Sequence, residues 1–251
     1  MAIALDRRPS QIQYDEHGFS SYEMLAGTYE GGIRNYRCNL KAGCTCTPEM
    51  FADKVVVVMF GKGRAYVTDE KDAYNVTELS FYFPNFDRTP YSVHAIDDTE
   101  FIMSVVDMNE WDWKVYNGSH ARLPLFRPIS KCVIYDQDCK GPNTDSFTVL
   151  RPCQLGRILL GAVRAVGDGT REKGHPCVAQ WNYCVGQSDF NLTVEDETVP
   201  TVAGDWSYVP AGLDHSLVSE TGKEAYYVWY EHFVREKDFL IKPLAKRFRD
   251  K

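Results

Sequence analysis

The stretch from Gly204 to His215 (GDWSYVPAGLDH) limits the possible folds of this chain more than any other stretch. Trp206 and the residues after it suit a β-strand. Pro210 and Gly212 predict a tight turn, because proline presets φ and glycine tolerates a positive φ. Such a turn fixes where the next strand begins, and therefore where His215 points. A histidine held in this way can be a metal ligand, a proton-transfer group or simply a half-buried strand residue.

The two halves of the chain repeat one order of strand and turn signals. In each half a buried strand closes at a glycine, a later strand stops at a proline, and a histidine follows that proline. The paired residues are Gly61 with Gly186, Pro84 with Pro210, and His94 with His215. Short strands with regular turn signals are typical of a β-sandwich or barrel. We therefore predict an all-β chain that uses one barrel unit twice.

The predicted boundaries follow the strand signals along the chain. Residues 1–30 are polar and mixed and are expected to form a short N-terminal arm, and a first barrel spans 31–118. Residues 119–145 carry three prolines and Gly141, which predicts a partly ordered connector. A second barrel spans 146–251. Its basic, amphipathic end from Phe239 to Lys251 predicts a short C-terminal helix.

Charge and composition narrow the classes of partner. The 251 residues carry a formal net charge of -7, which argues against nucleic acid or an anionic membrane as the main partner. No run approaches the ~18 apolar residues of a membrane span, and the start lacks the apolar stretch of a secretory signal. We read the eight cysteines as the reduced thiols of a cytoplasmic protein. A small polar metabolite is the partner that fits these features.

The spacing from Gly204 to His215 resembles the second sequence motif of the cupins: a glycine, five residues, a proline, one residue, a glycine, two residues and a histidine. Cupins are small antiparallel jelly-roll barrels that often hold one metal ion. Together with the repeat, the resemblance implies two tandem cupin jelly-roll barrels, a bicupin, over most of residues 30–235. Bicupins commonly associate through barrel edges, so the resemblance also implies a homo-oligomer.

The first cupin motif normally supplies two histidines and a glutamate before a strand that ends at a glycine. The segment from Gly174 to Gly186 lies in the corresponding place. His175 takes the position of the second histidine, and Lys173 takes that of the first. The glutamate position falls on Ala179 or Gln180. Strict alternation along a strand would require a bulge before Gln180 could join His175 on one face.

His175 and His215 are the pair that we predict to bind a divalent metal, with Gln180 or Cys177 as a further ligand. Two imidazoles and an oxygen suit Mn, Zn, Fe or Ni, whereas a thiolate would favour Zn. A metal-free pocket is the alternative. The first barrel offers only His94 and is predicted to be structural, without a metal.

Other side chains are expected to complete this site. Glu231, on a long aromatic strand, is a candidate general base if it points inward. Lys173 is a second catalytic candidate, because an ammonium can pair with a substrate carboxylate. Aromatic residues are expected to line the barrel, where they suit a small ligand or core packing alone. These are Trp181, Tyr183, Trp206, Tyr208 and Tyr227.

Three functions follow from these patterns as open alternatives. A bicupin with one loaded C-terminal barrel is similar to the (S)-ureidoglycine aminohydrolases, which implies Mn and hydrolytic release of ammonia from a ureido acid. That family binds its metal through a glutamate, two histidines and a glutamine. Here His175 falls on a histidine position, whereas Lys173 and His215 stand at the positions of the glutamate and the glutamine. The alternatives are a sugar or uronate isomerase, with proton transfer by His175, His215 and Glu231, and a non-catalytic small-molecule-binding cupin.

Overall fold

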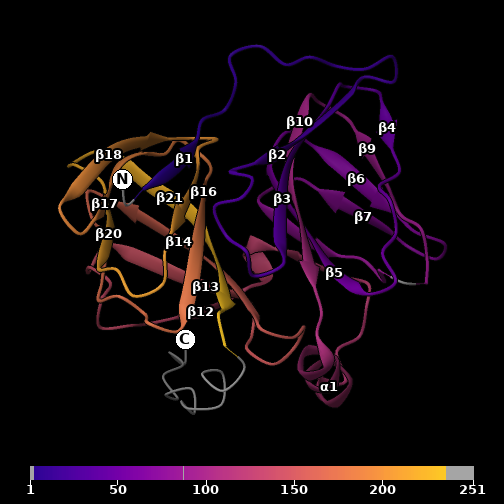
Figure 1. The fold of residues 1–251 in the computed structure, drawn as a ribbon. Helices are drawn as coiled ribbons and strands as arrows, with labels where there is room; N and C mark the ends of the chain where they lie inside the picture. The colour runs from indigo at the N-terminus through magenta and orange to yellow at the C-terminus, as the bar shows by residue number, and fades with distance from the viewer. Residues whose placement is uncertain (1–2, 87, 236–251) are drawn as a thin grey trace. The chain divides into compact units, whose positions relative to one another are not determined.

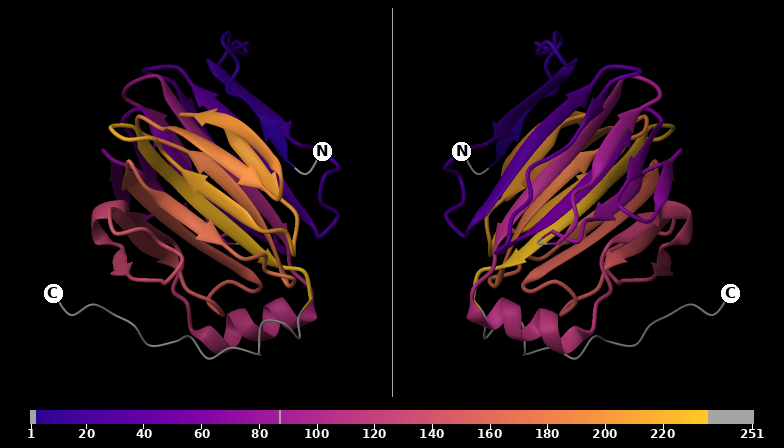
Figure 2. Two further views of the ribbon diagram at one scale, coloured as in Figure 1. Left: turned by 90° about the vertical axis from the view of Figure 1, so that its left-hand side faces the viewer. Right: turned by 90° about the vertical axis from the view of Figure 1, so that its right-hand side faces the viewer.

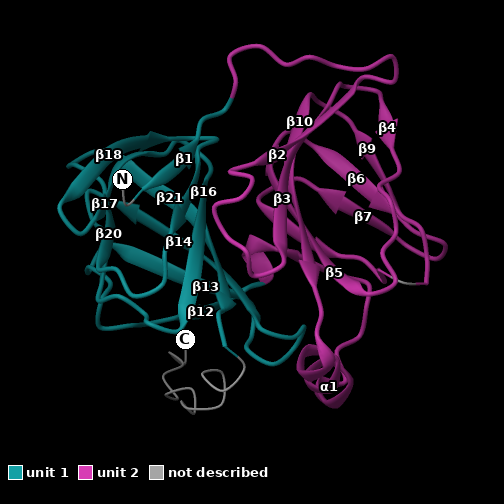
Figure 3. Cartoon of the chain, in the orientation of Figure 1, with its two compact units in different colours: residues 1–8, 132–251 teal, residues 9–131 magenta. Residues whose placement is uncertain are grey.

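The computed structural model describes residues 3–86 and 88–235, and its sheets are built from antiparallel strand pairs. The chain divides into two compact units, one of residues 9–131 and one of residues 1–8 and 132–251 (Figure 3). We call these units the N-terminal barrel and the C-terminal barrel. Among the described residues, no helix is long and apolar enough to cross a membrane.

The N-terminal barrel consists of a six-stranded and a four-stranded sheet. Its strands are β2 (Phe19–Met24), β3 (Ile33–Leu40), β4 (Thr45–Cys46), β5 (Lys54–Lys62), β6 (Ala65–Thr68), β7 (Ala73–Val76), β8 (Ser80–Phe83), β9 (Ser92–Ala95), β10 (Thr99–Asp107) and β11 (Leu125–Pro128). The helix α1 (Glu110–Ser119) follows β10, and the short 3-10 helix η1 (Ile129–Lys131) follows β11. The strand orders are β11-β8-β5-β10-β3-β2 and β4-β9-β6-β7.

The C-terminal barrel consists of a seven-stranded and a four-stranded sheet. Its strands are β1 (Ala4–Asp6), β12 (Val133–Tyr135), β13 (Thr144–Leu150), β14 (Ile158–Val166), β15 (Gly169–Glu172), β16 (Val178–Cys184), β17 (Asp189–Val194), β18 (Glu197–Val202), β19 (Trp206–Val209), β20 (His215–Val218) and β21 (Glu224–Phe233). The strand orders are β1-β19-β16-β21-β14-β13-β12 and β15-β20-β17-β18. The central strands β16, β21 and β14 lie side by side (Figure 1).

The two barrels share one topology, which confirms the predicted duplicated all-β fold. In the large sheets, the order β8-β5-β10-β3-β2 corresponds to β19-β16-β21-β14-β13. In the small sheets, β4-β9-β6-β7 corresponds to β15-β20-β17-β18. The long strands of each large sheet can be followed from two sides in Figure 2.

The structure places the predicted arm and connector within the sheets. Ala4–Asp6 pairs with β19 in the C-terminal barrel, whereas Phe19–Met24 pairs with β3 in the N-terminal barrel. Within the predicted connector, β11 pairs with β8 and β12 pairs with β13, so the chain passes from one unit to the other near residue 132. These short segments form strands because each satisfies the exposed backbone groups of an edge strand. The helix predicted from Phe239 to Lys251 lies outside the described residues.

Side-chain alternation gives the large sheet of the C-terminal barrel two distinct faces. Val163, Val209 and Tyr227 point into the barrel, where they join Leu192 and Leu217 of the small sheet in one buried core. Every residue of β16 is buried, as expected for a strand with both faces excluded from water. Because side chains alternate between the two faces, the position of a residue along its strand decides whether its side chain can reach the barrel interior.

Gly161 shapes the interior face by making room for Trp229. The two residues are direct partners on β14 and β21. A Cβ atom at position 161 would lie 2.1 Å from the Trp229 ring and 2.4 Å from the Phe147 carbonyl oxygen. These distances are far below van der Waals contact, so the missing side chain lets the indole lie against β14.

We predict that Gly161→Ala destabilises the protein by about 1–3 kcal/mol, because the added methyl overpacks against an indole and a fixed carbonyl. Gly118→Ala is the matched control, since a Cβ there meets nothing within 4 Å. In the helix α1 this control should be neutral or stabilise by up to about 1 kcal/mol. Urea unfolding followed by tryptophan fluorescence compares the variants, and equal midpoints would contradict the packing argument.

Candidate metal centre in the C-terminal barrel

A cavity of about 660 Å³ opens in the C-terminal barrel. It is lined by β13, β14, β16 and β21, together with residues 135–138 and Lys140. This volume lies within the range of roughly 300–1,000 Å³ that is usual for small-molecule sites. The polar and aromatic side chains that line the cavity include Lys140, Glu172, His175, Gln180, Trp229 and Glu231.

Glu172 and His175 line this cavity, and His215 lies close to both of them. Glu172 ends β15 and His215 begins β20, and the two are direct partners across these strands. His175 lies in the loop between β15 and β16, where its carbonyl accepts a 2.9 Å hydrogen bond from the Gly212 N–H. One potential ligand atom of each lies within 4.8 Å of the others. The turn before His215 therefore helps to position both histidines.

The Glu172 carboxylate is the centre of this group. Its Oε2 atom lies 2.9 Å from His175 Nε2 and 3.7 Å from His215 Nε2. Its Oε1 atom accepts a 2.9 Å hydrogen bond from Lys140 Nζ. Burial by itself would raise the pKa of Glu172, but His175 and the Lys140 ammonium outweigh burial and hold the pKa well below its usual range. Glu172 is therefore an anion at neutral pH.

His215 presents a neutral imidazole to Glu172. Its Nδ1 atom lies 3.1 Å from the Leu213 carbonyl oxygen, which can only accept, so Nδ1 carries the proton. Burial lowers the pKa of His215, which keeps Nε2 unprotonated. Nε2 is buried and has no hydrogen-bond partner among the described residues. An imidazole lone pair facing a carboxylate oxygen is an arrangement that suits a bound cation.

Gln180 brings an amide oxygen to the same cavity. Its Nε2 atom donates a 2.9 Å hydrogen bond to Asn182 Oδ1, which leaves Oε1 buried and without a hydrogen-bond partner in the described part of the chain. Such an orphaned acceptor is costly, and metal coordination would satisfy it. β16 pairs with β21 in continuous register. Gln180 therefore needs no bulge to join His175, because His175 lies in the preceding loop.

Glu231 lines the cavity from β21, directly opposite Gln180 on β16. Its side chain is half-buried. The surrounding protein displaces water from the carboxyl and raises the pKa of Glu231 to about 7, although His175 and Lys140 act in the opposite direction. A carboxyl that titrates near neutral pH can both accept and donate a proton during a reaction.

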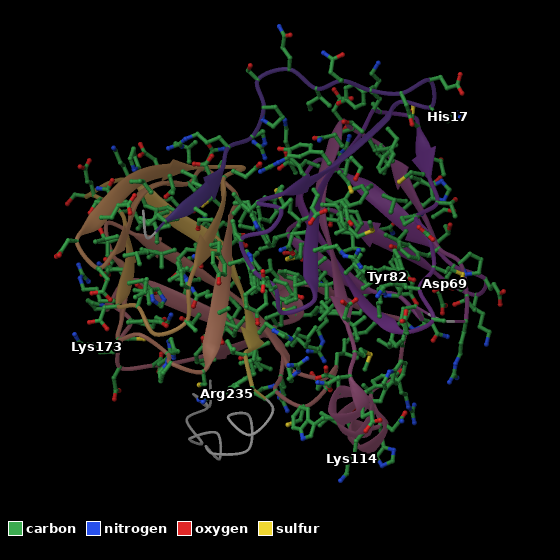
Figure 4. All side chains as sticks on the ribbon, in the orientation of Figure 1. His17, Asp69, Tyr82, Lys114, Lys173 and Arg235 are labelled. Carbon is green, nitrogen blue, oxygen red and sulfur yellow. The ribbon has the colours of Figure 1, made fainter. Side chains whose placement is uncertain are left out.

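Lys173, a predicted catalytic residue, does not line the cavity. Its side chain is 93% exposed and forms an ion pair with Asp214 at 2.5 Å, and Figure 4 labels it at the periphery of the C-terminal barrel. Adjacent side chains at a strand end point to opposite sides, so Glu172 faces inward instead. Sequence reasoning missed Glu172 and Lys140. For Glu172 the signal was present, one residue before the expected first histidine.

Of the aromatic residues expected to line the barrel, Tyr227 lines the cavity. The structure places the other four on the opposite face of the sheet, because on β16 and β19 they alternate with inward-facing residues. There they are buried and pack in pairs, with ring centroids 5.3 Å apart for Trp181 and Tyr208 and 6.2 Å apart for Tyr183 and Trp206. Trp229, which was not predicted, contributes an indole to the cavity.

Two other residues singled out in the sequence, Cys177 and His94, are not part of the Glu172–His175–His215 group. In the N-terminal barrel, His94 lies 2.9 Å from Thr45 Oγ1 and 2.8 Å from Thr68 Oγ1. Its ring stacks on Tyr66 at 4.4 Å between centroids. On β9 it alternates with buried residues, so it lies on the outer face of the small sheet.

Comparisons with known proteins identify the fold. No family model matches the chain, and no curated protein matches it. A protein of Pseudomonas aeruginosa described as glyoxylate-induced is 13% identical and has a TM-score of 0.75, over 97% of this chain and 92% of that one. A mutant oxalate decarboxylase of Bacillus subtilis is 14% identical with a TM-score of 0.67, over 92% of this chain and 77% of its own.

At these identities the likeness establishes the fold. The chain has the fold of two tandem cupin-type barrels, as the motif of its second barrel predicted. Its candidate metal centre is the group of Glu172, His175 and His215 in the C-terminal barrel.

The pKa of Glu231 predicts a stability that decreases as pH rises. The folded value of about 7 lies above the ordinary value of 4.5, so the folded state binds more protons between these two values. With a chelator present, the free energy of unfolding should fall by roughly 2–3 kcal/mol between pH 5 and 8 through this group. Glu231→Gln should remove that loss, and Glu220→Gln, at an exposed carboxylate, should keep it. Urea unfolding across this pH range measures the slopes, and equal slopes for wild type and Glu231→Gln would refute the assignment.

Proposed function

We propose that this bicupin is a metal-dependent enzyme that acts on a small polar metabolite in its C-terminal barrel. The observation that supports this most is the convergence of Glu172, His175 and His215 beside the orphaned oxygen of Gln180. Carboxylate, imidazole and amide donors suit Mn, Zn, Fe or Ni. The cavity beside them has the volume of a small-molecule site.

The residues around the metal ligands support acid–base chemistry on a bound substrate. A divalent metal held there would supply a Lewis acid that polarises a substrate oxygen. Glu231 stands opposite Gln180 and can transfer a proton to or from a substrate in the cavity. Tyr227 and Trp229, on the same face of β21, form an apolar wall against which a substrate is oriented.

The finer proposal is hydrolysis of a C–N bond with release of ammonia, as in the (S)-ureidoglycine aminohydrolases. Its support is the set of candidate ligands: one glutamate (Glu172), two histidines (His175 and His215) and one glutamine (Gln180). In this chain Glu172 stands one residue before the position of that family's glutamate, and Gln180 and His215 exchange the positions of glutamine and histidine. The same donor set is thus reached by a different order along the chain.

A sugar or uronate isomerase is the second candidate. The pKa of Glu231, which burial raises to about 7, favours it, because moving a proton between adjacent carbons needs a base that also returns the proton. Both candidates use the same metal ligands and differ in the substrate bond that changes.

We predict that the purified protein binds one Mn²⁺ or Zn²⁺ and that His175→Ala and His215→Ala each abolish this binding. His94→Ala is the matched control, because that histidine is held by two threonine hydroxyls in the other barrel. Elemental analysis after metal loading gives the stoichiometry, and circular dichroism checks folding. The proposal would be wrong if the wild-type protein takes up no metal, or if the His94→Ala variant loses metal binding.

We further predict ammonia release from ureidoglycine by the Mn²⁺-loaded enzyme, with at least a 100-fold loss in Glu231→Gln if Glu231 is the acid–base group. Ammonia is measured by a coupled assay. Proton NMR in D₂O with a panel of keto sugars and uronates tests the isomerase, which would incorporate solvent deuterium. Ligand-induced thermal shifts without turnover of any compound would favour a non-catalytic binding protein instead.

A further inference from the structure

Lys140 is a buried lysine in direct contact with the candidate metal centre. Its side chain is only 6% exposed, although it follows a surface turn. Backbone hydrogen bonds tie this turn to β15 on both sides, from Arg171 N–H to the Cys139 carbonyl and from Gly141 N–H to the Gly169 carbonyl, each at 3.0 Å. The position of Lys140 is therefore set by the sheet.

The ammonium of Lys140 is held by two oxygen atoms. It donates to Glu172 Oε1 at 2.9 Å and to Thr170 Oγ1 at 3.1 Å. Thr170 is fully buried and also accepts a 2.9 Å hydrogen bond from the Tyr227 hydroxyl. This chain of contacts runs from the barrel core to one oxygen of the carboxylate.

The two oxygens of Glu172 therefore have different environments. Oε1 faces Lys140, and Oε2 faces the Nε2 atoms of His175 and His215. We propose that Lys140 is a positioning residue, which holds Oε1 so that Glu172 offers a single oxygen, Oε2, to a metal ion. This inference rests on the proposed metal-dependent function. It implies that Glu172 fills one coordination position, which leaves more positions for Gln180 and for a substrate.

A lysine this close to a metal site can also weaken metal binding, which is opposite to the effect of positioning a ligand. Its positive charge repels a divalent cation, so simple removal of the charge would strengthen metal binding. A residue that orients a ligand has the opposite effect, because its loss typically weakens metal binding roughly 10–100-fold. The sign of the change in affinity therefore separates the two roles.

The test is Mn²⁺ affinity, measured by isothermal titration calorimetry on the full chain, for wild type and Lys140→Met. We expect roughly 10–100-fold weaker binding in the variant. We also expect a changed Mn²⁺ electron paramagnetic resonance spectrum, because a released Glu172 can offer both oxygens. Unchanged or tighter binding in Lys140→Met would overturn the positioning role. A wild-type protein that binds neither Mn²⁺ nor Zn²⁺ would instead overturn the proposed function itself.

Two further variants complete this test, one as a second test of the anchor and one as a control for charge. Thr170→Val keeps the charge of Lys140 but removes its second anchor, so it should weaken binding in the same direction and by a smaller factor. It also serves if Lys140→Met does not fold. Arg171→Met removes a neighbouring positive charge whose side chain is 64% exposed, and it should leave the affinity within twofold. If Thr170→Val binds Mn²⁺ as tightly as wild type, the anchoring argument fails.

Discussion

Burial of a carboxylate is unfavourable unless charged or hydrogen-bonding groups replace the lost water, and Glu172 is placed where such groups meet. Lys140 compensates the charge on one oxygen, and two imidazoles face the other. The rest of the site depends on this one group. The register of β15 against β20 sets His215 opposite it, and the turn before Gly141 brings Lys140 to it.

The duplicated topology shows how one barrel acquires such a group while the corresponding residues of the other barrel, Thr45 and His94, are arranged differently. In the N-terminal barrel, Thr45 on β4 is the direct partner of His94 on β9. In the C-terminal barrel, Glu172 on β15 is the direct partner of His215 on β20. His94 faces outward and His215 faces inward. Successive side chains of a strand point to opposite faces, so a shift of one residue along the strand is enough to cause this difference. The same fold therefore gives a surface histidine in one unit and a candidate ligand in the other.

Much of the fold was predictable because turn and periodicity signals are local. The proline–glycine turn before His215 indicated the barrel, and the segment from Gly174 to Gly186 singled out His175, which lines the cavity. What the sequence could not supply were contacts between distant segments. Lys140 lies 32 residues before Glu172 in a stretch that was predicted to be a connector. Trp181 was assigned to the interior by residue type, whereas strand parity places it on the other face.

The cavity is lined partly by central strands and partly by loops, and this difference indicates where substrate specificity can arise. Gln180 and Glu231 are direct partners on the two central strands, so the candidate ligand oxygen and the candidate acid–base group are fixed relative to one another by the backbone hydrogen bonds of the sheet. Gly161, on the next strand, leaves the space that the indole of Trp229 occupies. Residues 136–138 and 151–152, in contrast, line the cavity from irregular segments. Because loops accept substitution more readily than central strands, substrate choice can change there without disturbing the centre.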